Sequence, residues 1–138
     1  MKINPFILFQ ALLANMSAFY AIYYGPKGLK KKAIHTHYHT LVLAEGLKNS
    51  GNTVLNELFF DTIKVKPKKS LEEIKNRAES KCINLRYYDD GLHLGISLDE
   101  TITSRDINDL LDIFESKENF VIIILISIYY YFKKILFS

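Results

Sequence analysis

Apolar residues follow a helical spacing over the first third of the chain. Residues 10–24 contain no Gly or Pro and are apolar on nearly every side, which predicts a helix buried between other elements. Gly25-Pro26 should end it. A second helix is expected over residues 28–49, before the turn-forming residues 49–52. Its core-facing stripe comprises Leu29, Ala33, Thr36, Thr40, Leu43, Ala44 and Leu47.

The middle of the chain changes to a strand pattern and then back to a helix. Residues 57–66 end in alternating apolar and basic positions, which predicts a strand that Pro67 closes. Ser70 and Glu73 have the spacing of a capping box, in which the hydroxyl and the carboxylate each bind the other residue's backbone N–H. The predicted apolar face of the helix that follows consists of Leu71, Ile74, Ala78 and Cys82, so we expect Cys82 to be a small core residue.

Two further strands and a last helix complete the pattern. Residues 83–88 alternate, and so do residues 92–98, with a hairpin signal at residues 89–91 between them. Thr103 or Ser104 should cap the last helix. The apolar face of this helix is formed by Ile107, Leu110, Leu111 and Phe114.

The order of these elements is α-α-β-α-β-β-α, which predicts an α+β fold in which helices back a small, largely antiparallel sheet. The helix at residues 10–24 is too apolar to form the solvent-exposed surface of such a domain. It needs a further protein surface to pack against.

The composition excludes several classes of protein. The chain has 138 residues, enough for one modest core, and its single cysteine excludes a disulfide framework and a thiolate-rich zinc site. The net charge of +3 is uneven. Residues 1–69 hold ten Lys and Arg against three Asp and Glu, whereas residues 70–138 hold eight against twelve. A uniformly basic nucleic-acid-binding protein does not have this distribution, so we expect no nucleic-acid partner.

The two ends differ from the rest of the chain. Residues 1–9 have neither the apolar core of a signal peptide nor the Arg and Ser of a mitochondrial presequence. Residues 120–132 hold one Ser and no charge, but this apolar segment is only 13 residues long. A membrane span needs roughly 17–25 apolar residues. We therefore expect no membrane partner, although a tail anchor through residues 120–138 stays open as an alternative.

Three groups of residues are candidates for chemistry. His35 and His39 are four residues apart on a predicted helix and would present two metal ligands from one face. No third ligand and no adjacent Glu accompanies them, so a solvated or subunit-facing helix side explains them better. Lys27 and residues 30–32 form a basic cluster that a solvated helix face explains.

The paired carboxylates have local explanations. Asp89 and Asp90 precede Gly91 and suit a turn, whereas Asp99 and Glu100 suit the N-terminus of the next helix. No phosphate-binding glycine motif and no nucleophile elbow is present. The residues themselves therefore predict no catalytic, cofactor-binding or metal site in this chain.

Several strings, in this order, resemble the P-protein of the glycine cleavage system, glycine dehydrogenase (decarboxylating). They occur at residues 10–16, 21–29, 45–47, 58–62, 83–86 and 90–91. The most specific string is Leu-Gly-Ile-Ser-Leu-Asp-Glu-Thr at residues 94–101, which Asp106 and residues 109–111 follow. The resemblance covers residues 10–114. Ile34 and His35 stand where the family usually has basic residues, and His37 falls where it often has His.

The resemblance implies the small C-terminal-type domain of the first half of an aspartate-aminotransferase-like, fold type I enzyme. Such enzymes use pyridoxal 5′-phosphate (PLP) to decarboxylate glycine and pass the aminomethyl group to the lipoyl arm of H-protein. The resemblance also implies a whole enzyme that is mitochondrial and dimeric, as in eukaryotes. Its Schiff-base lysine belongs to the second half, and no lysine here matches that motif, so no catalytic or cofactor residue is carried over.

The resemblance also implies a division of the chain. Residues 10–114 are expected to be the family domain, and residues 1–9 and 115–138 to be sequence foreign to it. The chain is then interpreted as a fragment of an enzyme, inactive alone. The alternatives are a free-standing interaction domain, tethered to a membrane by its tail, and a metal-binding module through His35 and His39.

Overall fold

A computed structural model describes residues 5–115 of the chain, and the side chains from residue 10 onward. The expected apolar tail at residues 120–138 lies outside the described residues. The chain divides into two compact units, residues 1–34 and residues 35–138, which are taken in turn.

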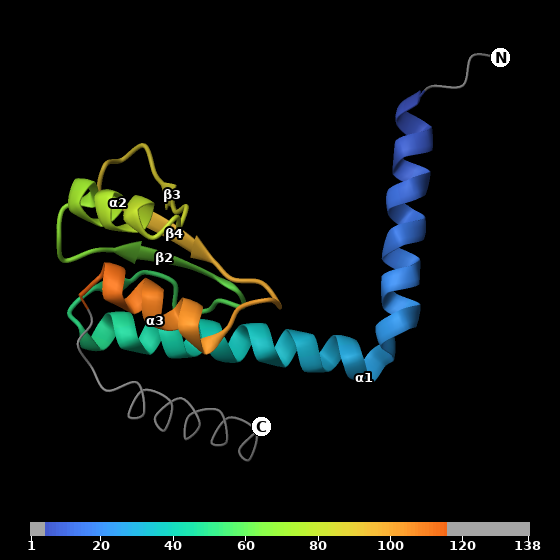
Figure 1. The fold of residues 1–138 in the computed structure, drawn as a ribbon, viewed down its shortest axis with the longest axis horizontal. Helices are drawn as coiled ribbons and strands as arrows, with labels where there is room; N and C mark the ends of the chain where they lie inside the picture. The colour runs from blue at the N-terminus through green and yellow to red at the C-terminus, as the bar shows by residue number, and fades with distance from the viewer. Residues whose placement is uncertain (1–4, 116–138) are drawn as a thin grey trace. The chain divides into compact units, whose positions relative to one another are not determined.

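The first unit contains most of helix α1 (Pro5–Asn49), which is interrupted at Gly25 (Figure 1). Gly25 has φ 60° and ψ 178°, a conformation outside the helical region that glycine adopts without a steric cost. The predicted helix end at Gly25 is thus confirmed as a break. The helix resumes at once because Pro26, which lacks an N–H, is tolerated in a first turn.

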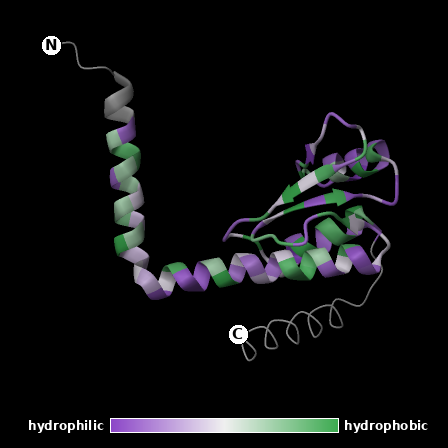
Figure 2. Ribbon diagram, turned by 180° about the vertical axis from the view of Figure 1, so that it is seen from behind, coloured by the Kyte–Doolittle hydropathy of each residue, from purple (hydrophilic) through white to green (hydrophobic). Residues whose placement is uncertain are grey.

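The stretch of α1 before this break exposes its apolar side chains. Figure 2 colours most of this part of the ribbon green or pale, which marks hydrophobic and weakly polar residues. Phe19 is 70% exposed and Tyr23 is 82% exposed. The predicted burial between other elements is therefore not found within the described chain. After the break, Leu29 is 36% exposed, so its expected place on the core-facing stripe is wrong. None of the helices in residues 5–115 combines the length and apolar character that crossing a bilayer requires.

The second unit is built on a four-stranded antiparallel sheet in the order β1-β2-β4-β3. The strands are β1 (Thr53–Val54), β2 (Thr62–Lys66), β3 (Arg86–Tyr87) and β4 (Leu94–Ser97). The predicted α+β class with an antiparallel sheet is confirmed. β2 begins five residues later than predicted, and β1 is an addition whose two residues carry no readable alternation.

Three helices share one hydrophobic core with the inward-facing side chains of this sheet: the part of α1 from His35 onward, α2 (Leu71–Ser80) and α3 (Ser104–Ile113). Figure 1 shows α1 and α3 running along the sheet. The fully buried large side chains include Leu43, Leu47, Ile63, Val65, Ile74, Leu94, Ile107 and Ile113. The stripe predicted for α1 is confirmed from Thr36 to Leu47, and Thr40 satisfies its buried hydroxyl by donating to the Thr36 carbonyl at 2.9 Å.

The C-terminus of α1 is closed by a Schellman motif. Gly51, at φ 84°, donates its backbone N–H to Lys48, and Asn52 donates its own to Leu47 at 3.0 Å. The buried Asn52 amide also donates to the Leu47 carbonyl and accepts from the Lys68 N–H. Asn52 therefore links the end of α1 to the segment after β2.

The N-terminus of α2 has half of the predicted capping box. The Ser70 hydroxyl accepts the Glu73 N–H at 3.3 Å, as expected. The Glu73 carboxylate pairs with the Lys69 ammonium instead of turning back to the Ser70 backbone. In α3 both halves are present, because Thr103 accepts from the Asp106 backbone and the Asp106 carboxylate accepts the Thr103 N–H at 2.8 Å.

Cys82 is exposed, so its predicted place in the core is wrong. Helix α2 ends at Ser80, two residues before the apolar spacing would bring Cys82 inward. Cys82 adopts φ 56° and donates its N–H to Glu79, while Ile83 donates to Ala78 at 2.9 Å. Cys82 thus occupies the left-handed position of a second Schellman motif, which glycine usually fills.

We predict that Cys82→Gly stabilises the chain by about 0.5–1 kcal/mol. The left-handed conformation costs a non-glycine residue about 1–2 kcal/mol, and the greater freedom of glycine in the unfolded chain offsets part of that gain. Urea unfolding of the two proteins measures the difference. Cys82→Val is the matched control and should destabilise, because a β-branched side chain tolerates positive φ poorly. A Cys82→Gly chain that unfolds at lower urea than the parent would contradict this explanation.

Candidate functional site

Two histidines of α1 hold two loops of the second unit. His35 forms a hydrogen bond from Nε2 to the Ile102 carbonyl at 2.9 Å, and His37 forms one from Nδ1 to the Phe60 carbonyl at 2.9 Å. The His37 ring also stacks on the Phe60 ring, with centroids 5.6 Å apart and planes within 5°. Each ring nitrogen that faces a carbonyl must carry the proton, so the hydrogen bonds fix the tautomers of both imidazoles.

His35 and His39, the candidate metal pair, each use a ring nitrogen in a hydrogen bond to a backbone carbonyl. His39 is buried, and its Nδ1 donates to the His35 carbonyl at 2.9 Å. The rings of His35 and His39 are close, with centroids 4.3 Å apart, as four-residue spacing on a helix requires. Among residues 5–115 no group of three His, Cys, Asp or Glu side chains is placed to hold a metal ion. His35 thus anchors the loop at Ile102, whereas His39 bonds within α1 itself.

A cavity of about 290 Å³ lies beside the C-terminal end of β4. Apolar side chains from β4, the segment before β3 and α3 form much of its wall, and Asn84, Ser97, Asp99, Thr101 and Asp106 add polar groups. His35 reaches this region through its bond to Ile102, which also lines the cavity.

The cavity carries negative charge. The Thr101 hydroxyl donates to Asp99 at 2.6 Å and lowers the pKa of that carboxyl group, and the Thr101 N–H donates to the same oxygen. The Thr103 hydroxyl does the same for Asp106 at 2.6 Å and lowers its pKa. Both carboxylates stay ionised at neutral pH, so the cavity suits a hydrogen-bond donor or a cation and repels a phosphate.

The sequence alone does not predict this cavity. Asp99 was expected near a helix N-terminus, and the structure places it in the turn before α3. The function of Asp106 as the capping carboxylate, and the contributions of Asn84 and Thr101, were missed. No local pattern joins Asn84 to Asp106; the only signal was the specific string at residues 94–101, which spans the cavity's edge.

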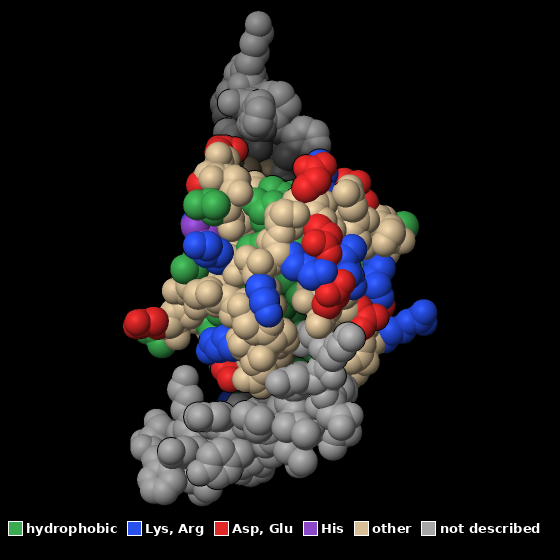
Figure 3. All heavy atoms as spheres, turned by 90° about the vertical axis from the view of Figure 1, so that its left-hand side faces the viewer, with side chains coloured by type: hydrophobic (Ala, Val, Ile, Leu, Met, Phe, Trp, Pro, Cys, Tyr) green, Lys and Arg blue, Asp and Glu red, His purple; other side chains and the backbone are tan. Residues whose placement is uncertain are grey.

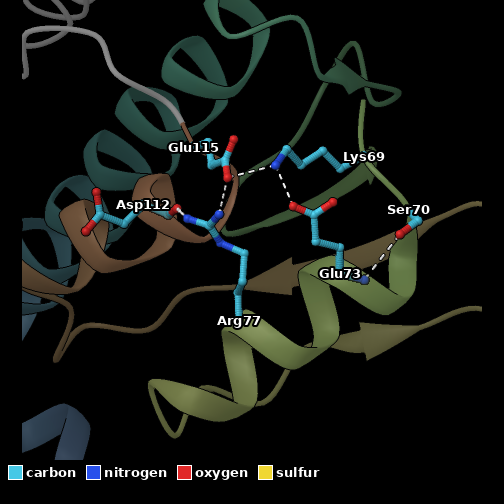
Figure 4. Close-up of polar contacts among 6 residues, drawn as sticks. All are labelled: Lys69, Ser70, Glu73, Arg77, Asp112 and Glu115. Atoms are coloured by element: carbon cyan, nitrogen blue, oxygen red, sulfur yellow. Dashed lines mark hydrogen bonds and ion pairs between the residues drawn. The ribbon is translucent and has the colours of Figure 1, made fainter.

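A second polar cluster joins α2 to the end of α3 (Figure 4). Arg77 donates to the Glu115 carboxylate and to the Asp112 carbonyl. Lys69 pairs with the same Glu115 at 2.7 Å, which lowers the pKa of that carboxyl group. Figure 3 shows blue and red side chains interleaved over this face. Since the charges neutralise one another, this cluster holds two helices together and offers no ligand site.

The other candidates remain at the surface. Lys30 and Lys31 are exposed, as a solvated helix face predicts, and the Lys32 ammonium lies 4.3 Å from the centre of the Tyr24 ring. Asp90 accepts the Leu92 and His93 N–H groups in the turn between β3 and β4, so the predicted hairpin there is confirmed.

We predict that Zn²⁺ leaves the melting temperature of the chain unchanged. His35 uses Nε2 to hold Ile102 and His39 uses Nδ1 to hold α1, so chelation would break a hydrogen bond or find only two ligands. Thermal unfolding with and without the metal measures this, and His35→Ala is the control. A rise in the melting temperature that His35→Ala abolishes would show a metal site instead.

Known proteins are similar to this chain in sequence and in fold. The family model for the glycine cleavage system P-protein matches residues 7–114. Mouse mitochondrial glycine dehydrogenase (decarboxylating) is 54% identical over 105 residues, and the human enzyme is 50% identical over 105 residues. Each alignment covers 76% of this chain and 10% of the relative. The glycine dehydrogenase (decarboxylating) of Photobacterium profundum is 49% identical, over 76% of this chain and 11% of its own.

A solved NifS-like protein has a similar fold, with a TM-score of 0.56 and 20% sequence identity over 64% of this chain and 29% of that structure. The chain spans about a tenth of the length of the relatives it matches. The family model covers well over half of the chain, and the chain belongs to the glycine cleavage system P-protein family.

Proposed function

We propose that this chain is a non-catalytic structural domain of a glycine dehydrogenase (decarboxylating). The whole enzyme decarboxylates glycine with PLP and transfers the aminomethyl group to the lipoyl group of H-protein, as a dimer. The chain alone is inactive. The observation that carries the proposal is the family match over residues 7–114, which contains the whole α+β core and extends over a tenth of the relatives' length.

The cavity beside β4 does not suit PLP. Its polar lining includes Asp99 and Asp106, which stay ionised and would repel the cofactor's phosphate, and no lysine lines it. PLP enzymes hold the cofactor through a lysine, so the residues of this cavity do not fit the cofactor. We infer that the cofactor, the Schiff-base lysine and the glycine site belong to other parts of the enzyme.

The domain's contribution is positional. The family match begins at residue 7, before the expected residue 10, so we take residues 7–114 as the family domain and residues 1–6 and 115–138 as lying outside it. The exposed apolar face before Gly25 supports assembly into a larger body, because a free-standing domain leaves few such side chains in water. The proposal places the whole enzyme in mitochondria, supported by the higher identity of the mouse relative, 54% against 49% for the bacterial one.

We predict that the purified chain neither binds PLP nor decarboxylates glycine. Titration with PLP should give no visible absorbance of a lysine-bound cofactor and no borohydride-stable adduct. Release of carbon dioxide from glycine, with H-protein present, should match the rate without the chain. A stoichiometric, borohydride-stable adduct would show that one of this chain's lysines is a Schiff-base residue and would overturn the proposal.

A further inference from the structure

The outward face of the sheet is strongly cationic. Antiparallel pairing places Lys64 of β2 and Arg86 of β3 on either side of Gly95 in β4. Lys66 follows Lys64 on the same face, because side chains alternate along a strand and Val65 between them is buried. The remaining outward strand positions hold Thr53, Thr62, Gly95 and Ser97. No acid occupies an outward position of these four strands.

Tyr88 orders the two central cations. A Cβ added to Gly95 would lie 3.4 Å from the Tyr88 hydroxyl oxygen and 3.5 Å from the ring, so the ring lies against the glycine. The Lys64 ammonium is 4.4 Å from the centre of this ring, and the Arg86 guanidinium carbon is 5.2 Å from it. Both distances are those of cation–π contacts, which hold the two side chains near one ring.

Two carboxylates lie beside this face. The Asp61 carboxylate accepts the hydroxyl of the outward-facing Thr62 at 2.9 Å. Asp90, in the turn between β3 and β4, is 3.8 Å from the Lys64 ammonium. Its closer partner is His93, whose Nδ1 lies 2.7 Å from the same oxygen, and this hydrogen bond lowers the pKa of Asp90 to about 2. Asp90 therefore neutralises at most one of the three cations.

We propose that this outward sheet face docks an acidic segment of a protein partner, with Lys64, Lys66 and Arg86 contacting its carboxylates around Tyr88. The charge of the face fits such a segment, and the ordering of Lys64 and Arg86 on Tyr88 lowers the entropy lost when a partner fixes them. The inference rests on the sheet face alone and stands apart from the proposed function.

The same geometry disfavours a nucleic acid. Single-stranded nucleic acids bind proteins by stacking bases on free aromatic faces between cations. The half-buried Tyr88 ring already contacts Gly95, Lys64 and Arg86, so a base that stacked on it would have to displace these contacts. Carboxylates need only the outer sides of the cations, which stay accessible.

The test uses the full chain and a fluorescent peptide of about eight glutamates, long enough to cross four strands spaced about 4.8 Å apart. We expect saturable binding at low salt that Lys64→Gln with Arg86→Gln weakens about fivefold, in line with exposed charge pairs. The matched control, Lys48→Gln with Lys75→Gln, removes the same charge from helices α1 and α2, where each lysine has an acidic neighbour. This control should change the affinity less than about twofold.

Amide chemical shifts of the unmodified chain give a second measurement that needs no variant. Peptide-induced shifts should fall on β2, β3 and β4. Absence of binding, equal weakening by both double variants, or shifts centred on other elements would overturn the proposal. Displacement of the peptide by a single-stranded oligonucleotide of equal charge at a lower concentration would also overturn it, because the face would then prefer nucleic acid.

Discussion

Burial of one face of the small antiparallel sheet is the constraint on which the rest of this structure depends. Ile63, Val65 and Leu94 are fully buried with Leu43 and Leu47 of α1 in a single core. Burying a side chain of this size contributes about 1.5–3 kcal/mol. Because side chains alternate along a strand, fixing these residues inward also fixes Lys64 and Arg86 outward. The core therefore determines the chemistry of the opposite face.

The same packing determines which polar side chains are held in hydrogen bonds and which line the cavity. The side chains of His35 and His37 project from α1 and bind the carbonyls of Ile102 and Phe60. They therefore act as loop anchors. The cavity beside β4 holds ionised Asp99 and Asp106, each bonded to a threonine hydroxyl. Neither feature resembles a nucleophile with its base. The proposed role of this chain, to support catalysis by position, therefore rests on its membership of the P-protein family.

Sequence reasoning was most successful where one local pattern decides the outcome. Helical spacing identified the buried stripe of α1 from Thr36 onward, and strand alternation identified the inward face of β4. It was wrong for Cys82, because the Schellman motif that ends α2 depends on backbone geometry that apolar spacing does not encode. It missed the cavity and the Tyr88 cluster, because both join residues from separate strands and loops whose proximity only the register creates.

Grafting tests the central claim, that this chain is a positioning domain of the enzyme, most directly. Residues 10–114 would replace the matching segment of mouse glycine dehydrogenase (decarboxylating), and glycine decarboxylation with H-protein would be measured. The claim predicts a chimera that binds PLP and turns over glycine, whereas the same graft carrying Leu43→Asp, which places a charge in the core, should lose activity. A chimera that is soluble and folded but binds no PLP and releases no carbon dioxide would contradict it.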